Sequence, residues 1–400
     1  MARRTAPKSR SLLVLILLTT LPAVRAFAVP GDAESLEVAA RWAMGPAQAI
    51  HAAADLLLVG EGSRVRVFDN SYPDAPRLLG RVRVHGVVLG IDRAGDLAAV
   101  AADRGGLRLI DLSDPGAPQE IGASVTDGVA HAVRLANERA VVAEGVAGLR
   151  VCDLSDPSKP VELGAYTHDL YPIDVAVVED RAYVADNAES AMKVFDVSDP
   201  ADIRLEHSVP LSYLPMAVDA DGTRAVVVDD YTGITAFDLA PPAAPALAAS
   251  DWLPSTGHDV RIDGDLAFVA QDLGGLSVVD LDAATGLPVL GAVGTTGDGR
   301  GVTVLGARAH LADDFGGVRT IDVSTPASPV SIWSQDGVGE LRKVCTEGSV
   351  GYVVDPRHGL HVLRSTAAGD ALHLATVEIA GGPQQLDVED GVAYVAAGET

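Results

Sequence analysis

The chain alternates short apolar runs with polar turn residues over almost its whole length. Residues 130–166 show the pattern, because the apolar runs AHAVRLA, AVVAE, LRVCD and VELGAY are separated by the turn sequences NER, GVAG and LSDPSKP. Each run has the length and composition of a β-strand, and the Pro and Gly residues between runs leave no stretch long enough for a helix. The pattern predicts four short antiparallel strands in about 42 residues.

This four-strand unit recurs along the chain. The third run of each unit ends in an aspartate, and the aligned ends are VRVFD at Asp69, LRLID at Asp111, LRVCD at Asp153, MKVFD at Asp196, ITAFD at Asp238, LSVVD at Asp280 and VRTID at Asp322. Successive aspartates are 42 residues apart, except for one step of 43 caused by an extra residue within DNAESAM. One more step reaches Arg364 in a degenerate eighth copy, and residues 391–396 begin a partial ninth.

Repeats of four strands predict an all-β fold of the β-propeller class. A four-stranded blade cannot bury both of its faces alone, so neighbouring blades need matching surfaces and therefore matching sequences. We expect about eight blades over residues 34–400, with seven and nine as alternatives. Residues 34–42, ESLEVAARW, would supply a fourth strand that closes the ring. The recurring aspartate is expected to cap the turn that follows it through side-chain to backbone hydrogen bonds.

The repeat resembles the LVIVD-repeat family of bacterial and archaeal exported or cell-surface proteins. The resemblance rests on the aspartate-ending pentads, on the DLSDP turns at 111–115 and 153–157, on DVSDP at 196–200, and on strands such as AYVAD at 182–186. It covers about residues 34–400. The resemblance implies an exported propeller and no particular activity.

Residues 1–28 have the features of a secretory signal peptide. Four basic residues precede the apolar run 12–18, and Ala26-Phe27-Ala28 is a small-residue cleavage pattern. We therefore expect a secreted, periplasmic or cell-surface protein with no membrane insertion after cleavage. The chain stops after two strands of the ninth unit, so either the natural protein continues to an anchor or further domain, or ring closure is irregular.

The charge of the chain limits its partners. Lys and Arg number 30 against 55 Asp and Glu, for a net charge of −25, and five of the bases lie in residues 1–28. The resulting acidic surface repels phosphate, which excludes nucleic acid. A monomer that binds a protein or glycan partner is expected. Cys152 and Cys345 are predicted to be buried hydrophobic residues, and the chain has no HExxH, Gly-x-Ser-x-Gly or Cys-x-x-Cys motif.

The first strand of each blade lines the central channel of a propeller, so one column of residues there is the leading candidate site. Counting back 22 residues from each aligned position gives Ala47, Leu89, His131, Asp174, Met216, His258, Arg300, Arg342 and Gln384. The polar side chains favour ligand binding at the channel mouth. The candidates are His131, Asp174, His258, Asp259, Arg300 and Arg342.

A second column is acidic and lies where the second strand of each blade ends. The candidate metal ligands in it are Glu144, Asp186, Asp229, Asp313 and Asp355. Ringed carboxylates suit calcium, which prefers oxygen ligands. The alternative is that cross-strand pairs such as Arg300 with Asp313 or His131 with Glu144 only stabilise the mouth.

Aromatic residues are scarce, and several lie in or just after fourth strands. We expect Trp42, Trp252 and Trp333 to pack between blades, with contact to a partner or glycan as the alternative for connector residues such as Tyr171 and Tyr213. The first functional hypothesis is an interaction module that binds at the channel mouth. The alternatives are a propeller enzyme of the metal-assisted hydrolase or lactonase type, and a structural or adhesive surface protein.

Overall fold

The computed structural model describes residues 46–125, 127–272, 274–335, 343–347, 350–355, 359–365, 371–379, 383–389 and 392–397. The described residues fall into two compact units, one before and one after residue 337, and each is considered by itself. Residues 1–28, the expected closing strand at 34–42, Trp42 and Arg342 lie outside the described residues.

The first unit consists of seven four-stranded antiparallel sheets, each made by one repeat with its strands in chain order. The first three sheets contain β1 Ala47–Ala52, β2 Leu56–Glu61, β3 Arg64–Asp69 and β4 Arg77–Arg83; β5 Gly90–Ala94, β6 Leu97–Ala101, β7 Leu107–Asp111 and β8 Gln119–Ser124; β9 Ala132–Ala136, β10 Arg139–Ala143, β11 Leu149–Asp153 and β12 Val161–Tyr166. The next two contain β13 Pro172–Val178, β14 Arg181–Asp186, β15 Ala191–Asp196 and β16 Arg204–Pro210; β17 Pro215–Ala220, β18 Arg224–Asp229, β19 Gly233–Asp238 and β20 Ala246–Trp252. The last two contain β21 Gly257–Asp263, β22 Leu266–Gln271, β23 Gly275–Asp280 and β24 Val289–Val293; β25 Gly301–Leu305, β26 Arg308–Ala312, β27 Val318–Asp322 and β28 Val330–Gln335.

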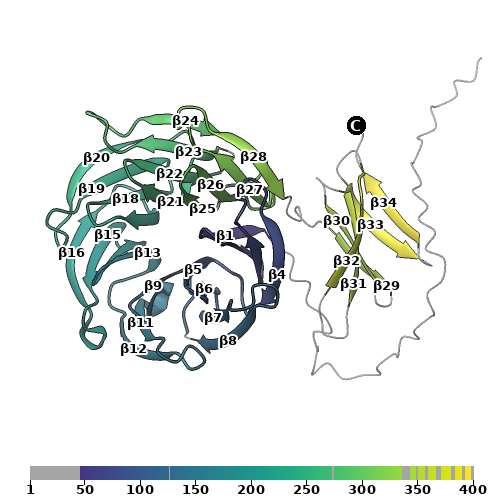
Figure 1. The fold of residues 1–400 in the computed structure, drawn as a ribbon, viewed down its shortest axis with the longest axis horizontal. Helices are drawn as coiled ribbons and strands as arrows, with labels where there is room; N and C mark the ends of the chain where they lie inside the picture. Colours follow the sequence, from purple (N-terminus) through teal and green to yellow (C-terminus); the bar gives the residue numbers. More distant parts are fainter. Residues whose placement is uncertain are drawn as a thin grey trace, which may run out of the picture. The chain divides into compact units, whose positions relative to one another are not determined.

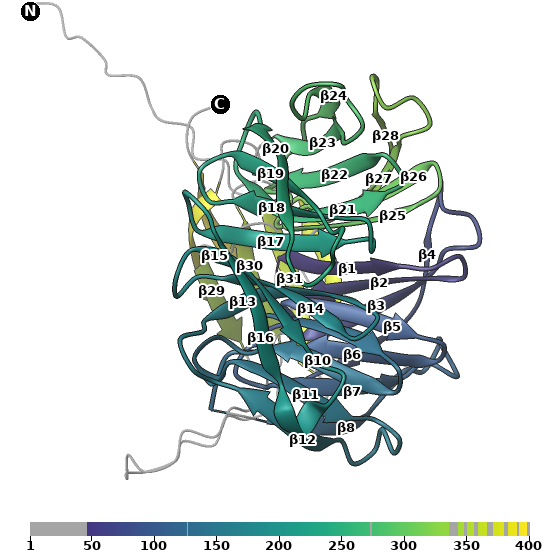
Figure 2. The ribbon, with the colours of Figure 1, turned by 90° about the vertical axis from the view of Figure 1, so that its left-hand side faces the viewer.

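The seven sheets stand around a central channel as the blades of a propeller, with the first strand of each innermost (Figure 1; Figure 2 gives the view from the side). No strand is exchanged between sheets. The seventh sheet meets the first through two hydrogen bonds of 3.0 Å that join the backbones of Ala47 and Asp314. The ring therefore closes with seven blades, one of the two alternatives to the expected eight, because the seventh sheet meets the first and leaves no place for another. The expected all-β propeller of four-stranded blades is confirmed.

The second unit continues the same repeat. It contains a four-stranded sheet of β29 Lys343–Glu347, β30 Val350–Asp355, β31 Gly359–Ser365 and β32 Ala371–Val377, and a two-stranded sheet of β33 Pro383–Glu389 and β34 Val392–Ala397. In the described part of the chain the only helices are two single turns of 3₁₀ helix, at Gly145–Ala147 and Pro200–Asp202, and none is long and apolar enough to cross a membrane. Both cysteines are free, with Cys152 buried and Cys345 half-buried.

The hydrophobic core lies between adjacent blades, which explains the continuous apolar runs of the third strands. Leu109 and Ile110 are neighbours in β7 and both are fully buried, because Leu109 packs against the third sheet and Ile110 against the first. Burying each side chain stabilises the fold by about 1.5–3 kcal/mol. Matching sequences in successive repeats thus follow from matching faces, as the repeat predicted.

The recurring aspartate caps the turn that follows the third strand in each of the seven blades. The Asp153 carboxylate accepts a hydrogen bond of 3.1 Å from the backbone N–H of Ser155 and one of 2.8 Å from the Ser155 hydroxyl. These two bonds lower the pKa of Asp153. The Pro157 carbonyl of this turn approaches Gly122 of the previous blade so closely that a Cβ there would lie 2.0 Å from it. The turn sequence is therefore part of the contact between blades.

Candidate functional site

A cavity of about 100 Å³ lies in the channel where the innermost strands begin. One residue from each of the seven blades forms its upper layer. These residues are Gln48, Leu89, His131, Ile173, Met216, His258 and Arg300. Residues one to three positions further along the strands complete the lining, among them Asp174, Asp259, Arg134 and Arg261.

The structure brings five of the six predicted mouth residues to this cavity: His131, Asp174, His258, Asp259 and Arg300. The sixth, Arg342, is outside the described residues. In the fourth blade the predicted column is displaced by one residue, because the extra residue of DNAESAM lies between β14 and β15 and the count back from Asp196 crosses it. Ile173 therefore takes the column position, and Asp174 pairs with Ala185 one step further in.

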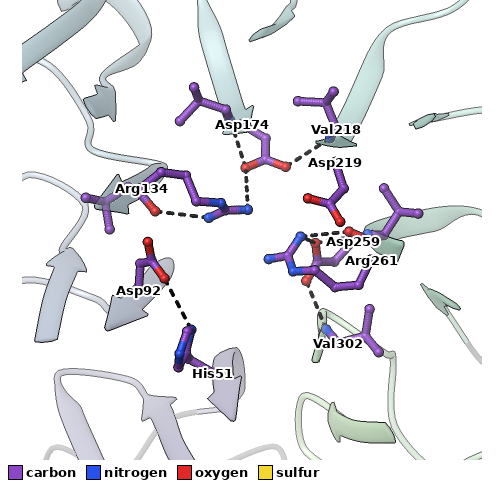
Figure 3. A network of polar contacts seen from close by, with 12 residues as sticks. His51, Asp92, Arg134, Asp174, Val218, Asp219, Asp259, Arg261 and Val302 are labelled. Carbon is purple, nitrogen blue, oxygen red and sulfur yellow. Dashed lines mark hydrogen bonds and ion pairs between the residues drawn. The ribbon is translucent and has the colours of Figure 1, made fainter. Parts of the chain in front are cut away.

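The carboxylates of the cavity bind backbone N–H groups of the next blade (Figure 3). Asp174 Oδ2 accepts from Val218 N at 2.9 Å, and Asp259 Oδ2 accepts from Val302 N at 2.9 Å. The other oxygen of each accepts from the following residue of its own strand, also at 2.9 Å. The innermost strand is a sheet edge with unpaired N–H groups, so these aspartates satisfy donors that would otherwise have no partner.

A second layer repeats this arrangement two residues deeper. Asp92 Oδ2 accepts from Leu135 N at 2.7 Å, and Asp219 Oδ2 accepts from Ile262 N at 2.8 Å. Across the ring closure, the Thr303 hydroxyl accepts from Ala52 N at 3.2 Å. The two layers connect successive blades at the channel wall and fix the position of each carboxylate.

Two arginines balance the negative charge of these layers (Figure 3). Arg261 Nη1 lies 2.9 Å from Asp259 Oδ1, and Arg134 Nη2 lies 3.8 Å from Asp174 Oδ1. Burial raises the pKa of Asp259 to about 6, although the Arg261 charge opposes the shift. Burial alone would lower the pKa of Arg261, but the surrounding carboxylates, Asp259 first, outweigh it and raise that pKa.

Three residues that line the cavity each have a buried polar atom with no hydrogen-bond partner among the described residues. These atoms are Gln48 Oε1, His131 Nε2 and Arg134 Nη2. Burial lowers the pKa of His131, so its imidazole is neutral at pH 7, and the ring packs against Tyr171 with centroids 6.0 Å apart. A neutral imidazole nitrogen, an amide and a guanidinium N–H together offer both donors and acceptors to a bound group.

The rim of the cavity carries a charged cluster. His258 Nε2 lies 2.5 Å from Asp272 Oδ1, and Arg300 Nη1 lies 3.1 Å from the same imidazole nitrogen. Arg300 also pairs with Asp298 at 3.2 Å and with Asp314 at 3.5 Å. The predicted pairing of Arg300 with Asp313 is therefore wrong, because Asp313 pairs with Arg319 at 2.6 Å.

The acidic column lies inside individual blades and does not converge. Each acid binds groups of its own blade and its loops: Glu144 binds Arg150, Asp186 binds Lys193 at 2.8 Å, Asp229 accepts from Gly233 N at 2.7 Å, Asp313 binds Arg319, and Asp355 lies 3.5 Å from His361 Nε2. In the part of the chain that the structure describes, no three His, Cys, Asp or Glu side chains come close enough to hold a metal ion.

The aromatic residues divide into packed and exposed ones. Trp333 packs edge-on against Phe68 with centroids 6.3 Å apart, as expected for a residue between blades. The expectation was wrong for Trp252, whose side chain is 57% exposed. The aromatic rings that Trp252 contacts are those of Tyr213 and Tyr231.

The predicted column contains one residue per blade and therefore does not include the deeper residues of the site. Arg134, Arg261, Asp92 and Asp219 lie further along the first strands, where an antiparallel strand turns the same face inward every second residue. Charged residues in otherwise apolar runs such as AHAVRLA and GHDVRID are the signal that would have revealed them.

The fold and the channel site define the class, a β-propeller with an independent four-strand repeat in each blade. The chain belongs to the LVIVD-repeat family, whose repeat matches it at residues 88–126, 127–168, 172–210, 256–289 and 296–336. The first and fifth blades fall outside these ranges and share the same architecture. No curated protein matches the chain.

Two solved structures illustrate the shared fold. The computationally designed protein Ika8 is similar over 80% of this chain and 96% of its own, with 12% identity and a TM-score of 0.57. PorZ of Porphyromonas gingivalis, described as an essential bacterial surface component of the type-IX secretion system, is similar over 84% of this chain, with 12% identity and a TM-score of 0.55. The matched region is 46% of PorZ, so this chain spans about half of that protein.

Proposed function

We propose that the protein is an exported interaction module and that its channel-mouth face binds a partner, with the cavity receiving a small uncharged polar group of that partner. One observation carries the proposal. Gln48, His131 and Arg134 line one cavity, and each has a buried polar atom without a hydrogen-bond partner in the described part of the chain: Gln48 Oε1, His131 Nε2 and Arg134 Nη2. Buried polar groups in native proteins are hydrogen-bonded with few exceptions, so these three atoms favour a bound group or water.

The charge at the cavity supports an uncharged group. Three guanidinium groups and the carboxylates of Asp174 and Asp259 line it. Two more carboxylates, Asp92 and Asp219, act on the same Arg261 charge. Opposite charges therefore nearly cancel, and neither an isolated anion nor an isolated cation gains much from entering.

The volume limits the group to a few heavy atoms. A cavity of about 100 Å³ holds the volume of roughly three water molecules. A side-chain amide or the hydroxyl groups of a sugar fit this size and offer both donors and acceptors. Larger parts of the partner would rest on the surrounding face.

Several observations support binding over catalysis. The described lining residues include no Ser, Thr, Cys, Lys or Tyr that could serve as a nucleophile. Both Asp174 oxygens already accept backbone hydrogen bonds, which leaves this carboxylate poorly suited to act as a base.

The order of basic, apolar and small residues in residues 1–28 supports export. PorZ, a protein of similar fold, is a surface component, and we propose a surface or secreted location for this chain as well.

The test is a titration of the purified protein with acetamide, acetate and methylammonium, which match in size and differ in charge. The readout is the imidazole NMR signal of His131, assigned with the variant His131→Gln. Acetamide has four heavy atoms, so we expect saturable binding with a Kd on the order of millimolar. Arg134→Met should weaken this binding at least about tenfold, because it removes a charge-assisted donor.

Arg139→Met is the matched control, because Arg139 begins β10, at the far end of the hairpin from the cavity, and its guanidinium bonds the Ser198 carbonyl. It should leave the acetamide affinity unchanged. Tighter binding of acetate or methylammonium than of acetamide would contradict the proposed uncharged group, and no response to acetamide would contradict the cavity as a binding site.

A further inference from the structure

Three aromatic side chains form a cluster on the fifth blade, at the end where β17 begins. Tyr213 lies in the connector between β16 and β17, Tyr231 in the turn between β18 and β19, and Trp252 ends β20. The two tyrosine rings stack with centroids 4.7 Å apart and planes 19° apart. Trp252 stands edge-on to both, at 6.1 Å and 5.9 Å. We call these three residues the aromatic patch.

The aromatic patch faces solvent. The exposed fractions are 37% for Tyr213, 59% for Tyr231 and 57% for Trp252, and the neighbouring Leu214 is 39% exposed. Contiguous exposed apolar side chains with polar neighbours are typical of binding sites, whereas single exposed residues are ordinary. Tyr and Trp are also the residues most often found at binding hot spots.

The other blades show that the fold does not require aromatic residues there. The register of the first strands aligns Tyr213 with five residues of other blades, which are Gly86, Gly128, Leu170, Ser255 and Gly297. The fifth blade is also one of the two that the family repeat does not match. The patch is therefore a departure from the repeat and not a product of it.

The charge around the aromatic patch selects a cationic occupant. Segments 211–216, 229–233 and 250–256 contain three carboxylates, Asp229, Asp230 and Asp251, and no Lys, Arg or His. Asp230 accepts a hydrogen bond from Leu214 N at 3.2 Å, which holds this carboxylate next to the connector of Tyr213. Asp251 accepts from Trp252 N at 2.8 Å and from Leu287 N of the sixth blade at 3.3 Å, so it adds negative charge to this edge of the blade. Aromatic faces attract cations, and nearby carboxylates add to the attraction.

We propose that the aromatic patch docks an arginine-bearing segment of a partner protein. The planar guanidinium stacks on an exposed ring face and donates hydrogen bonds to the flanking carboxylates, whereas the Lys ammonium is a hydrated point charge that stacks less well. None of the three patch residues lines the cavity, so this inference does not rest on the proposed function.

The test uses three blocked pentapeptides that differ only at two positions, carrying arginine, citrulline or glutamate. Citrulline keeps the shape of arginine without its charge. The readout is tryptophan fluorescence, with Trp252→Phe to assign the signal. We expect the arginine peptide to bind and the citrulline peptide to bind at least about tenfold more weakly, with no response to the glutamate peptide. Tyr231→Ala should weaken arginine-peptide binding at least about tenfold, and Asp230→Asn should reduce both its affinity and its dependence on salt.

Tyr72→Ala is the matched control, because Tyr72 is 77% exposed and takes no part in the aromatic patch. It should leave peptide binding unchanged, and unfolding curves of all variants establish that they fold. Equal affinity for the arginine and citrulline peptides, or full affinity in Tyr231→Ala, would overturn the proposal. Arg134→Met separates the two proposals, because it should weaken acetamide binding at least about tenfold and leave the peptide affinity intact.

Discussion

Neutralising one acid of the buried column should destabilise the propeller, and neutralising its partner as well should restore it. The pair in the third blade joins Glu144 Oε1 to Arg150 Nη2, with side chains 0% and 3% exposed. Arg150 also donates to Ser124 Oγ at 3.0 Å. Gln271 and Ser277 occupy the same two positions in the sixth blade, and they form a neutral hydrogen bond of 2.5 Å. The chain thus contains a neutral version of the pair.

The expected magnitude follows from the loss of the partner charge. Glu144→Gln leaves a buried guanidinium without its carboxylate, which costs about 3–5 kcal/mol. We expect roughly 3 kcal/mol, the low end of that range, because Glu162 remains 3.7 Å from Arg150 Nη1. The double variant Glu144→Gln with Arg150→Ser copies the sixth blade and should lie within about 1 kcal/mol of the original protein.

The assay is urea unfolding followed by tryptophan fluorescence. With a slope of about 3 kcal/mol per molar urea, the single variant should lower the unfolding midpoint by roughly 1 M. Glu162→Gln is the control, because Glu162 is half exposed and its pair should contribute less than about 1 kcal/mol. The reasoning is refuted if Glu144→Gln and Glu162→Gln have equal effects, or if Arg150→Ser restores no stability to Glu144→Gln.

Two further perturbations test the channel wall and the core. Asp174→Asn should cost about as much as Asp174→Ala, roughly 1–3 kcal/mol in thermal unfolding, because both carboxylate oxygens accept from N–H groups and an amide nitrogen cannot; full stability in the Asn variant would contradict this. Burial lowers the pKa of His310 to about 4, below its value of 6.5 in the unfolded chain. Below pH 6.5 the unfolded state therefore binds more protons than the folded state. The contribution of His310 to the free energy of unfolding is complete above pH 6.5 and falls by roughly 3 kcal/mol as the pH drops to 4. His310→Gln should flatten this part of the profile, and an unchanged slope would show that other groups cause it.

The sequence predicts the fold because each repeat contains its own evidence. The four runs of each unit, the recurring aspartate and the Pro-containing turn all appear as strands and capped turns. The number of blades is harder to predict from the sequence, because the eighth copy at Arg364 follows at the same spacing as the seven copies that form the ring. Contacts between the first and seventh blades, such as the backbone bonds of Ala47 with Asp314 and the packing of Trp333 on Phe68, show where the ring closes.

The candidate site could be predicted in outline only. Counting residues places His131 and His258 correctly, but an extra residue in one loop moves Asp174 by one position. The partners of the acidic column depend on which strand each side chain faces. Asp186 stands opposite Ala191 in β15, and its ion partner Lys193 is the diagonal neighbour two residues further on, which spacing alone does not reveal. Trp252 contacts Tyr213 and Tyr231, which come from separate connections, so its surroundings could not be predicted from its own segment.

The most direct test of the central claim, that the channel mouth is a binding site, is the imidazole spectrum of His131 during the acetamide titration. The account predicts a saturable shift whose Kd rises at least about tenfold in Arg134→Met and is unchanged in Arg139→Met. A spectrum that does not respond to acetamide, or that responds equally in both arginine variants, would contradict it.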